Sequence, residues 1–194
     1  MCLLRRLLSS SVNWYPLYVL LEAVVHASTP RDDGRGWLKM PDITRADRWF
    51  VCGLGHVHWG ARGGAGLLLR YRDPSGGARY LLGQRSRWMD EGGTWGIPGG
   101  AIHDGESPEE AAHREANEEI SPVPAYLVAG TERDECGGGW TFYLVIADVD
   151  LPFEALVRHQ TDATGWFSLK EMATLPLHPR FRAWAEKHLG LQAP

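Results

Sequence analysis

Short apolar runs separated by glycine- and proline-rich segments predict a series of strands along the chain. Compact runs of this kind, bounded by turn residues, are typical of buried strands. We therefore expect strands at 49–57, 65–71, 79–84, 123–133, 140–149 and 165–168. The turn residues at 73–77 predict a hairpin over 65–84, and residues 136–139 are the expected turn between the next two strands. Residues 95–100 carry too much glycine and proline for a central strand.

Residues 108–120 carry the strongest helix signal. Ser107 is a good N-cap, Pro108 suits the first helical position, and Glu110 completes a capping box. The helix is expected to end at Ser121-Pro122, because proline cannot continue the hydrogen-bond ladder. Its apolar positions form a narrow stripe that can lie against a sheet, namely Ala111, Ala112, Ala116 and Ile120.

The order of these elements predicts an α/β domain. Strands precede and follow one central helix, and two further helices are expected at 169–174 and 179–189. This order favours a mixed β-sheet layered with helices. We place the domain at 41–190, between an extension at 1–40 and a short tail at 191–194.

The extension at 1–40 has more than one interpretation. A basic start at Arg5 and Arg6 followed by an apolar stretch at 15–25 loosely imitates a secretory signal. Against this, Pro16 and Glu22 interrupt the apolar stretch. The alternatives are a poorly tethered extension with one short helix at 17–25, and a true start at Met40. Residues 28–36 have the composition of a linker.

Composition and charge exclude several classes. An apolar share of 44% with nine Trp is enough to build a core and excludes global disorder. The formal net charge is −4, so the chain has no overall basic surface and we expect no nucleic-acid partner. The charge is concentrated, however, because residues 104–119 hold seven acids and one base. That window carries −6, and the rest of the chain carries +2.

The cysteines and the lack of a long apolar run indicate location. Cys2, Cys52 and Cys136 are odd in number and widely spread, so they do not form a disulfide framework and we expect a cytoplasmic protein. No apolar run approaches the ~20 residues needed to cross a bilayer, so no membrane partner is expected. Cys52, His56 and His58 give a Cys-x3-His-x-His pattern, which has too few ligands and unusual spacing for a closed zinc site.

Three carboxylates share one side of the predicted helix. Glu115 is three residues from Glu118 and four from Glu119, and like charges at this spacing cost ~0.2–0.5 kcal/mol per pair. The last two also lie at the negative end of the helix dipole. A divalent cation would turn this repulsion into attraction, and Mg²⁺ prefers oxygen ligands. The alternative is a solvated acidic face, with the charge partly offset by Arg114.

The segment that contains these glutamates resembles the Nudix box, G-x5-E-x7-R-E-U-x-E-E-x-G-U, where U is a bulky apolar residue. Six of its seven fixed letters are present, namely Gly100, Glu106, Arg114, Glu115, Glu118 and Glu119. The preceding Trp-Gly-Ile-Pro-Gly at 95–99 is similar to the run-in that is usual in the family. The chain departs from the pattern at Ala116, Ser121 and Pro122. Serine in place of the C-cap glycine is expected to alter how the helix ends, and no carboxylate is lost.

The resemblance implies an α/β/α sandwich and a Mg²⁺-dependent hydrolase, with Mn²⁺ as a substitute, that cleaves a phosphoanhydride of a nucleoside diphosphate derivative. It implies that Glu115, Glu118, Glu119 and the carbonyl of Gly99 are the metal ligands. Glu115 is the first choice for general base and Glu118 the second. Arg114 would orient the glutamates, paired with Glu106. A further acid from a later loop is often added in the family, and Asp162 and Glu154 are the candidates.

Two other activities are compatible with the family fold. One is a regulatory domain that binds a nucleotide or sugar phosphate without hydrolysing it, which usually has an eroded box. The other is an isomerase acting on a prenyl diphosphate, which would need a reactive cysteine, and neither Cys52 nor Cys136 has a supporting motif. The intact carboxylates favour hydrolysis over both.

The substrate signals are weaker. Arg85 and Arg87 are candidates for binding phosphate, and Trp88 and Trp95 for stacking on a base, although packing is the simpler role for either tryptophan. Gly100 is the remaining candidate for substrate contact. ADP-ribose and a nucleoside triphosphate such as an oxidised dGTP are both compatible with these residues, and a homodimer is left open.

Overall fold

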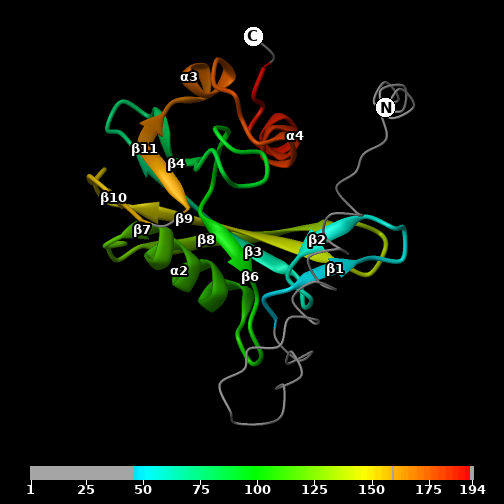
Figure 1. Ribbon diagram of the computed structural model, residues 1–194. Helices are drawn as coiled ribbons and strands as arrows, with labels where there is room; N and C mark the ends of the chain where they lie inside the picture. Colours follow the sequence, from blue (N-terminus) through cyan, green and yellow to red (C-terminus); the bar gives the residue numbers. More distant parts are fainter. Residues whose placement is uncertain (1–45, 159, 193–194) are drawn as a thin grey trace, which may run out of the picture. The chain divides into compact units, whose positions relative to one another are not determined.

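A mixed sheet forms the centre of the computed structural model, which describes residues 46–158 and 160–192 (Figure 1). The main path of the sheet is β11-β4-β3-β9-β8. These strands are β3 (Gly64–Arg72), β4 (Ala78–Arg85), β8 (Leu127–Glu135), β9 (Thr141–Val149) and β11 (Thr161–Phe167). β3 and β9 are parallel, and the other neighbours on this path are antiparallel.

Helices cover the two faces of this sheet. α2 (Pro108–Glu119) packs on one face, and α3 (Leu169–Ala173) and α4 (Pro179–His188) contribute to the core on the other (Figure 1). This arrangement confirms the α/β/α sandwich and the mixed sheet. No helix in the described part of the chain is long and apolar enough to cross a membrane.

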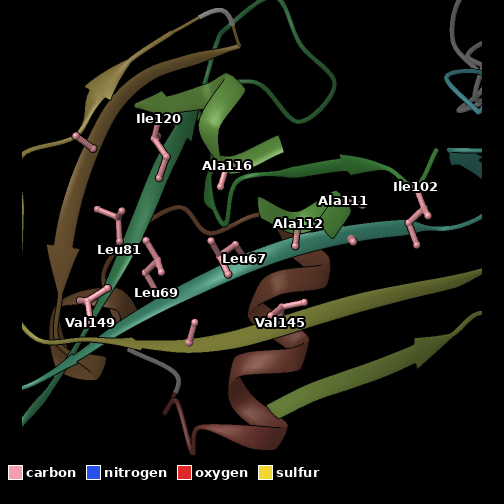
Figure 2. Close-up of a cluster of buried hydrophobic side chains, with 13 residues drawn as sticks. Leu67, Leu69, Leu81, Ile102, Ala111, Ala112, Ala116, Ile120, Val145 and Val149 are labelled. Carbon is pink, nitrogen blue, oxygen red and sulfur yellow. The ribbon is translucent and has the colours of Figure 1, made fainter. Parts of the chain in front are cut away.

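The central strand β3 is apolar on both faces. Leu67 and Leu69 pack towards α2, whereas Leu68 packs into the core beneath α4, and all three are fully buried. Figure 2 shows the first of these cores, where the alanines of α2 lie over Leu67 and Val145. Small side chains on α2 let the helix backbone approach the sheet closely, and this fixes the position of its opposite, acidic face.

The start of α2 is as predicted and its end differs. Ser107 and Glu110 form both hydrogen bonds of the capping box, and Pro108 is the first helical residue. The helix ends at Glu119, where the chain turns directly into β7 (Ile120–Ser121), which pairs with β10 (Leu156–Val157). Ser121 does not take the left-handed conformation of a C-cap glycine, since Glu91 is the only non-glycine residue with positive φ in the described part of the chain.

Several predicted boundaries move. The single strand predicted at 49–57 is wrong, because β1 (Trp49–Val51) and β2 (Val57–Trp59) form a hairpin whose turn uses Gly55 at φ +79°. The glycine-rich segment after β4 forms two short strands beside the main path, β5 (Trp95–Gly96) on β4 and β6 (Gly99–Ala101) on β3. The hairpin predicted over 65–84 and the turn at 136–139 are confirmed. The helix predicted at 17–25 and the linker at 28–36 lie outside the described residues.

Candidate active site

Arg114 joins α2 to the loop that precedes it. Its guanidinium donates to both carboxylate oxygens of Glu106, with Nε–Oε1 2.7 Å and Nη2–Oε2 3.0 Å, and to the Ala101 carbonyl at 2.8 Å. The ion pair implied by the Nudix resemblance is therefore present in the structure. Arg114 holds the pKa of Glu106 down to about 2, and Glu106 in turn raises the pKa of Arg114. Both groups stay charged, so the loop and the helix are held by a two-pronged, charge-assisted contact.

The same guanidinium reaches two of the clustered carboxylates. Arg114 Nη1 donates to Glu115 Oε1 at 2.8 Å and lies 3.4 Å from Glu118 Oε1. Glu115 is largely buried, with 14% of its side chain exposed, whereas Glu118 is 57% exposed. Burial raises the pKa of Glu115. The single positive charge of Arg114 thus faces the carboxylates of Glu115 and Glu118, so their negative charge is only partly compensated.

Glu119 is held from the opposite side of the site. It accepts hydrogen bonds from the Gly99 backbone N–H at 3.0 Å and from Thr161 Oγ1 at 2.9 Å. Both donors are neutral, and burial raises the pKa of Glu119. Thr161 lies at the start of β11, 42 positions away along the chain, and the sequence contained no signal for its role.

The two glycines before the loop have steric roles. A Cβ on Gly100 would stand 2.5 Å from the Glu115 carboxylate, and a Cβ on Gly99 would stand 2.5 Å from the Ala65 carbonyl oxygen. Contacts this short are repulsive. A side chain at position 99 would meet backbone atoms, and one at position 100 would push the Glu115 carboxylate from its observed place. Gly99 lets β6 lie against β3, and Gly100 leaves space for the carboxylate of Glu115.

The three glutamates converge on one cleft. It encloses about 520 Å³ and is lined by Trp88, Glu115, Glu118, Glu119 and Gln160. A set of carboxylate oxygens in an open cleft matches what Mg²⁺ or Mn²⁺ requires, since these ions take oxygen ligands and keep several waters. The donors present therefore fit a divalent cation of this type.

The candidate substrate residues differ in whether they lie at the cleft. Trp88 is 71% exposed and lines the cleft, and Arg87 is exposed beside it. Arg85 lies close enough for its charge to oppose the rise in the Glu119 pKa. Trp95 packs edge-on against Phe167, with ring centroids 5.0 Å apart, and does not line the cleft.

The two acids proposed from later loops do not line the cleft either. Asp162 accepts a hydrogen bond from the buried Ser86 hydroxyl, and Glu154 is exposed. A third acid, Asp47, acts on Glu115 through its charge and is held by His103, with Nε2–Oδ1 3.0 Å. No pattern in the sequence pointed to Asp47.

A family model described as the NUDIX domain matches residues 62–188, which is well over half of the chain. The chain belongs to the Nudix family. The matched residues include all of the cleft and the Arg114 network.

Two curated relatives show how this Nudix chain compares with known proteins. A Mycobacterium tuberculosis protein named "Putative 8-oxo-dGTP diphosphatase 3" is 38% identical over 146 residues, which is 71% of this chain and 66% of the relative. A Bifidobacterium longum "Nucleoside triphosphate pyrophosphatase/Nudix hydrolase fusion protein" is 45% identical over 104 residues, 52% of this chain and 21% of the relative. The chain thus spans less than two-thirds of the length of either curated relative.

The similarity extends to a solved structure. The crystal structure of a Nudix hydrolase from M. smegmatis, RenU, is 38% identical and superposes with a TM-score of 0.66. The match covers 74% of this chain and 92% of that protein. The Nudix fold described above is therefore shared with a relative of clear sequence similarity.

Proposed function

We propose that this Nudix protein is a divalent-metal-dependent hydrolase that cleaves a phosphoanhydride bond in a nucleoside diphosphate linked to another group. The observation that carries this proposal is the convergence of Glu115, Glu118 and Glu119 on one open cleft. The regulatory alternative, which binds without hydrolysis, would tolerate loss of these carboxylates, and all of them are present and positioned.

The metal would be held by the three glutamate carboxylates, with the Gly99 carbonyl as a further oxygen ligand. A bound Mg²⁺ or Mn²⁺ supplies charge neutralisation on the phosphates and lowers the pKa of a water that attacks phosphorus. The chain's own contribution is orientation. Arg114 fixes Glu115, and the Gly99 N–H and the Thr161 hydroxyl fix Glu119, so the carboxylates meet the ion without reorganising.

Glu115 is our first candidate for the general base that accepts the proton of the attacking water. Its carboxylate lines the cleft and is held in place by Arg114 Nη1 at 2.8 Å, which sets the geometry that a general base needs. Glu118 is the second candidate because it is exposed at the cleft, where a water molecule can reach it.

A nucleoside triphosphate is the substrate class that the M. tuberculosis relative favours. Its name specifies 8-oxo-dGTP. In this chain the exposed Trp88 ring at the cleft can stack on a purine. For phosphate, Arg85 acts on Glu119 through its charge, and Arg87 precedes Trp88 in the chain. We therefore place an oxidised purine triphosphate ahead of ADP-ribose, and we propose that the protein works in the cytoplasm.

The test is a turnover panel with identified products. The full chain is incubated with Mg²⁺ and 8-oxo-dGTP, the ordinary nucleoside triphosphates, ADP-ribose and dinucleotides, and products are separated by ion-exchange chromatography. We expect a monophosphate and pyrophosphate, or a diphosphate and phosphate, from a triphosphate, and the pair identifies the bond cleaved. Nucleotide binding without turnover of any substrate would instead establish the regulatory alternative.

Adding a methyl group at Gly100 should disable the site with a modest effect on the fold. In Gly100→Ala the new Cβ would stand 2.5 Å from the Glu115 carboxylate, so this side chain must move. A displacement of about 1 Å can cost ~100-fold in rate, and we expect kcat to fall about 10- to 100-fold. Gly130→Ala is the matched control, because a Cβ there meets nothing within 4 Å. Equal rates for the two variants in a steady-state assay would contradict the proposed placement of Glu115.

Removing the Trp88 ring should weaken substrate binding. Base stacking on an aromatic side chain is worth ~1–3 kcal/mol, so Trp88→Ala should raise KM about tenfold with little change in kcat. Trp88→Phe keeps an aromatic face and should restore most of the lost affinity. An unchanged KM in Trp88→Ala would show that the base binds elsewhere.

A further inference from the structure

Four side chains with metal-binding atoms converge at the end of the β1–β2 hairpin, and the Nudix site does not use them. Their ligand atoms all lie within 4.8 Å of one another, and the residues are Cys52, His56, His58 and Cys136. Three of the four come from the hairpin. The fourth, Cys136, follows β8 at the turn into β9, 84 positions after Cys52. The sequence pattern alone lacked a fourth ligand, and the fold supplies it.

The separations match a tetrahedral metal site. The two sulfurs are 3.4 Å apart, and Cys136 Sγ lies 3.2 Å from His56 Nδ1 and 3.2 Å from His58 Nε2. Zinc bonds of about 2.3 Å to sulfur and about 2.0–2.1 Å to nitrogen place two sulfurs about 3.8 Å apart and sulfur and nitrogen about 3.6 Å apart. An ion at the centre therefore requires each of these three pairs to separate by only a few tenths of an ångström, and the other pairs lie within 4.8 Å. Both cysteines are free thiols, so no disulfide occupies the position.

Backbone hydrogen bonds hold both turns in place. In the hairpin, the Cys52 N–H donates to the His56 carbonyl at 2.9 Å. At the other turn, the Cys136 N–H donates to the Trp140 carbonyl at 3.0 Å. A direct bond from the Gly53 N–H to the Gly138 carbonyl, 2.7 Å long, joins the two turns.

Gly138 makes this close approach sterically feasible. A Cβ at this position would stand 2.6 Å from Cys52 Sγ, so a side chain here would push the thiol away. The ligand positions are therefore set by the backbone of two turns and do not depend on flexible side chains alone. Pre-positioned ligands of this kind are a feature of structural metal sites.

Neighbouring rings support the buried histidine. His58 is 3% exposed and stacks on Trp140, with ring centroids 4.2 Å apart and planes 9° from parallel. Arg180 Nη2 lies 3.3 Å from His58 Nδ1, and its guanidinium also lies over the Trp140 ring. Binding of a metal at Nε2 leaves the proton on Nδ1, so we expect Arg180 to give up that hydrogen bond and keep its contact with Trp140.

The donor set indicates both the metal and its role. Two thiolates and two imidazoles are the ligands of closed zinc sites, whereas Mg²⁺ prefers oxygen. None of the four residues lines the glutamate cleft, so the two clusters share no ligand and differ in the type of their donor atoms. Four protein ligands leave no open position for a reacting water, which favours a structural role over a catalytic one.

We propose that Cys52, His56, His58 and Cys136 bind one structural zinc ion that clamps the β1–β2 hairpin to the β8–β9 turn. The two thiolates balance the charge of the ion. This clamp joins the hairpin to the central sheet, in which β9 is the parallel neighbour of β3. The proposal stands independently of the proposed hydrolase activity.

The first test is the zinc content of the full-length chain, purified under reducing conditions and measured by inductively coupled plasma mass spectrometry. We expect about one zinc per chain, at least tenfold less in Cys136→Ser and His58→Asn, and full retention in Cys2→Ser, which is the matched cysteine control. Glu118→Gln should also retain the zinc. Loss of zinc in Glu118→Gln with retention in Cys136→Ser would place the ion at the glutamates and overturn the proposal.

The second test uses the unaltered chain, so it does not depend on whether the variants fold. Metal-free protein is titrated with Co²⁺ under anaerobic, reducing conditions. We expect one equivalent to produce a thiolate-to-cobalt charge-transfer band and the intense visible absorption of a tetrahedral site, both abolished by stoichiometric Zn²⁺. Only weak octahedral absorption, or mass-spectrometric detection of a Cys52–Cys136 disulfide in the reduced preparation, would overturn the proposal.

Discussion

Replacing Glu118 with glutamine should lower kcat/KM at least about 100-fold, equivalent to about 2.7 kcal/mol of transition-state stabilisation, because a proposed metal ligand loses its charge. The fold should be unaffected. Glu118 is 57% exposed, and Arg114 Nη1 lies 3.4 Å from its Oε1. The substitution also removes like-charge repulsion with Glu115, so stability should stay constant or rise by ~0.2–0.5 kcal/mol.

This combination separates a functional role from a structural one. Steady-state kinetics and urea unfolding are measured on the same preparations, with Glu109→Gln as the control. Glu109 lies in the first turn of the same helix, where it accepts a hydrogen bond from the Thr131 hydroxyl, and it does not line the cleft. A Glu118→Gln variant as active as Glu109→Gln would refute the assignment of Glu118 as a ligand.

Removing the Arg114 guanidinium should have the largest effect on stability. It leaves Glu106 and Glu115 without their ionic partner, and both carboxylates are mostly shielded from water. Breaking a buried ion pair from one side costs ~3–5 kcal/mol, and for this partly exposed pair we expect about 2–3 kcal/mol in Arg114→Ala. Activity should fall as well, since Glu115 loses the contact that orients it.

The pH dependence of stability gives a second signature of this pair. The folded pKa of Glu106 is about 2, below the usual 4.5, because Arg114 favours the charged carboxylate. A lowered carboxyl pKa contributes stability that is fully present above the unfolded pKa and is lost as pH falls through the folded pKa. The unaltered protein should therefore lose up to about 3 kcal/mol from this group between about pH 5 and pH 2, and most of that loss should disappear in Arg114→Ala.

Urea unfolding at pH 7 and at a series of pH values down to about 2 measures both effects. Arg133→Ala is the control, because the Arg133–Glu135 pair is 59% exposed on both sides and should contribute less than about 1 kcal/mol. If Arg114→Ala and Arg133→Ala destabilise equally, and with the same pH dependence, the Arg114 network is not what joins the loop to α2.

The parts of the site that were predictable from sequence are those specified by nearby residues. The capping box at Ser107 and the alanine stripe of α2 are local signals, and together they fix which face carries the glutamates. The pairing of Glu106 with Arg114 also spans only eight positions. The capping box and the alanine stripe follow from helix geometry, whereas the Glu106–Arg114 pair was implied by the Nudix resemblance.

The remaining contacts depend on how distant strands meet. Thr161 reaches Glu119 because β11 pairs with β4, and Trp88 and Gln160 reach the cleft from two separate loops. Cys136 joins the histidine pair across 78 positions and more. The pattern of a single sequence contains no signal for contacts between residues so far apart along the chain. The requirement for glycine at position 100 likewise became clear only from the location of the Glu115 carboxylate.

The central claim is that the glutamate cluster binds the divalent cation that makes hydrolysis possible. The most direct measurement is the rate of 8-oxo-dGTP hydrolysis in metal-depleted buffer and then with added Mg²⁺, for the unaltered chain and Glu118→Gln. Depleting the buffer, without a strong chelator, leaves the proposed zinc site filled. We predict no hydrolysis above background without Mg²⁺, full activity on its addition, and at most about one-hundredth of that rate in Glu118→Gln. Hydrolysis that needs no added metal, or that Mg²⁺ restores equally in both proteins, would contradict the account.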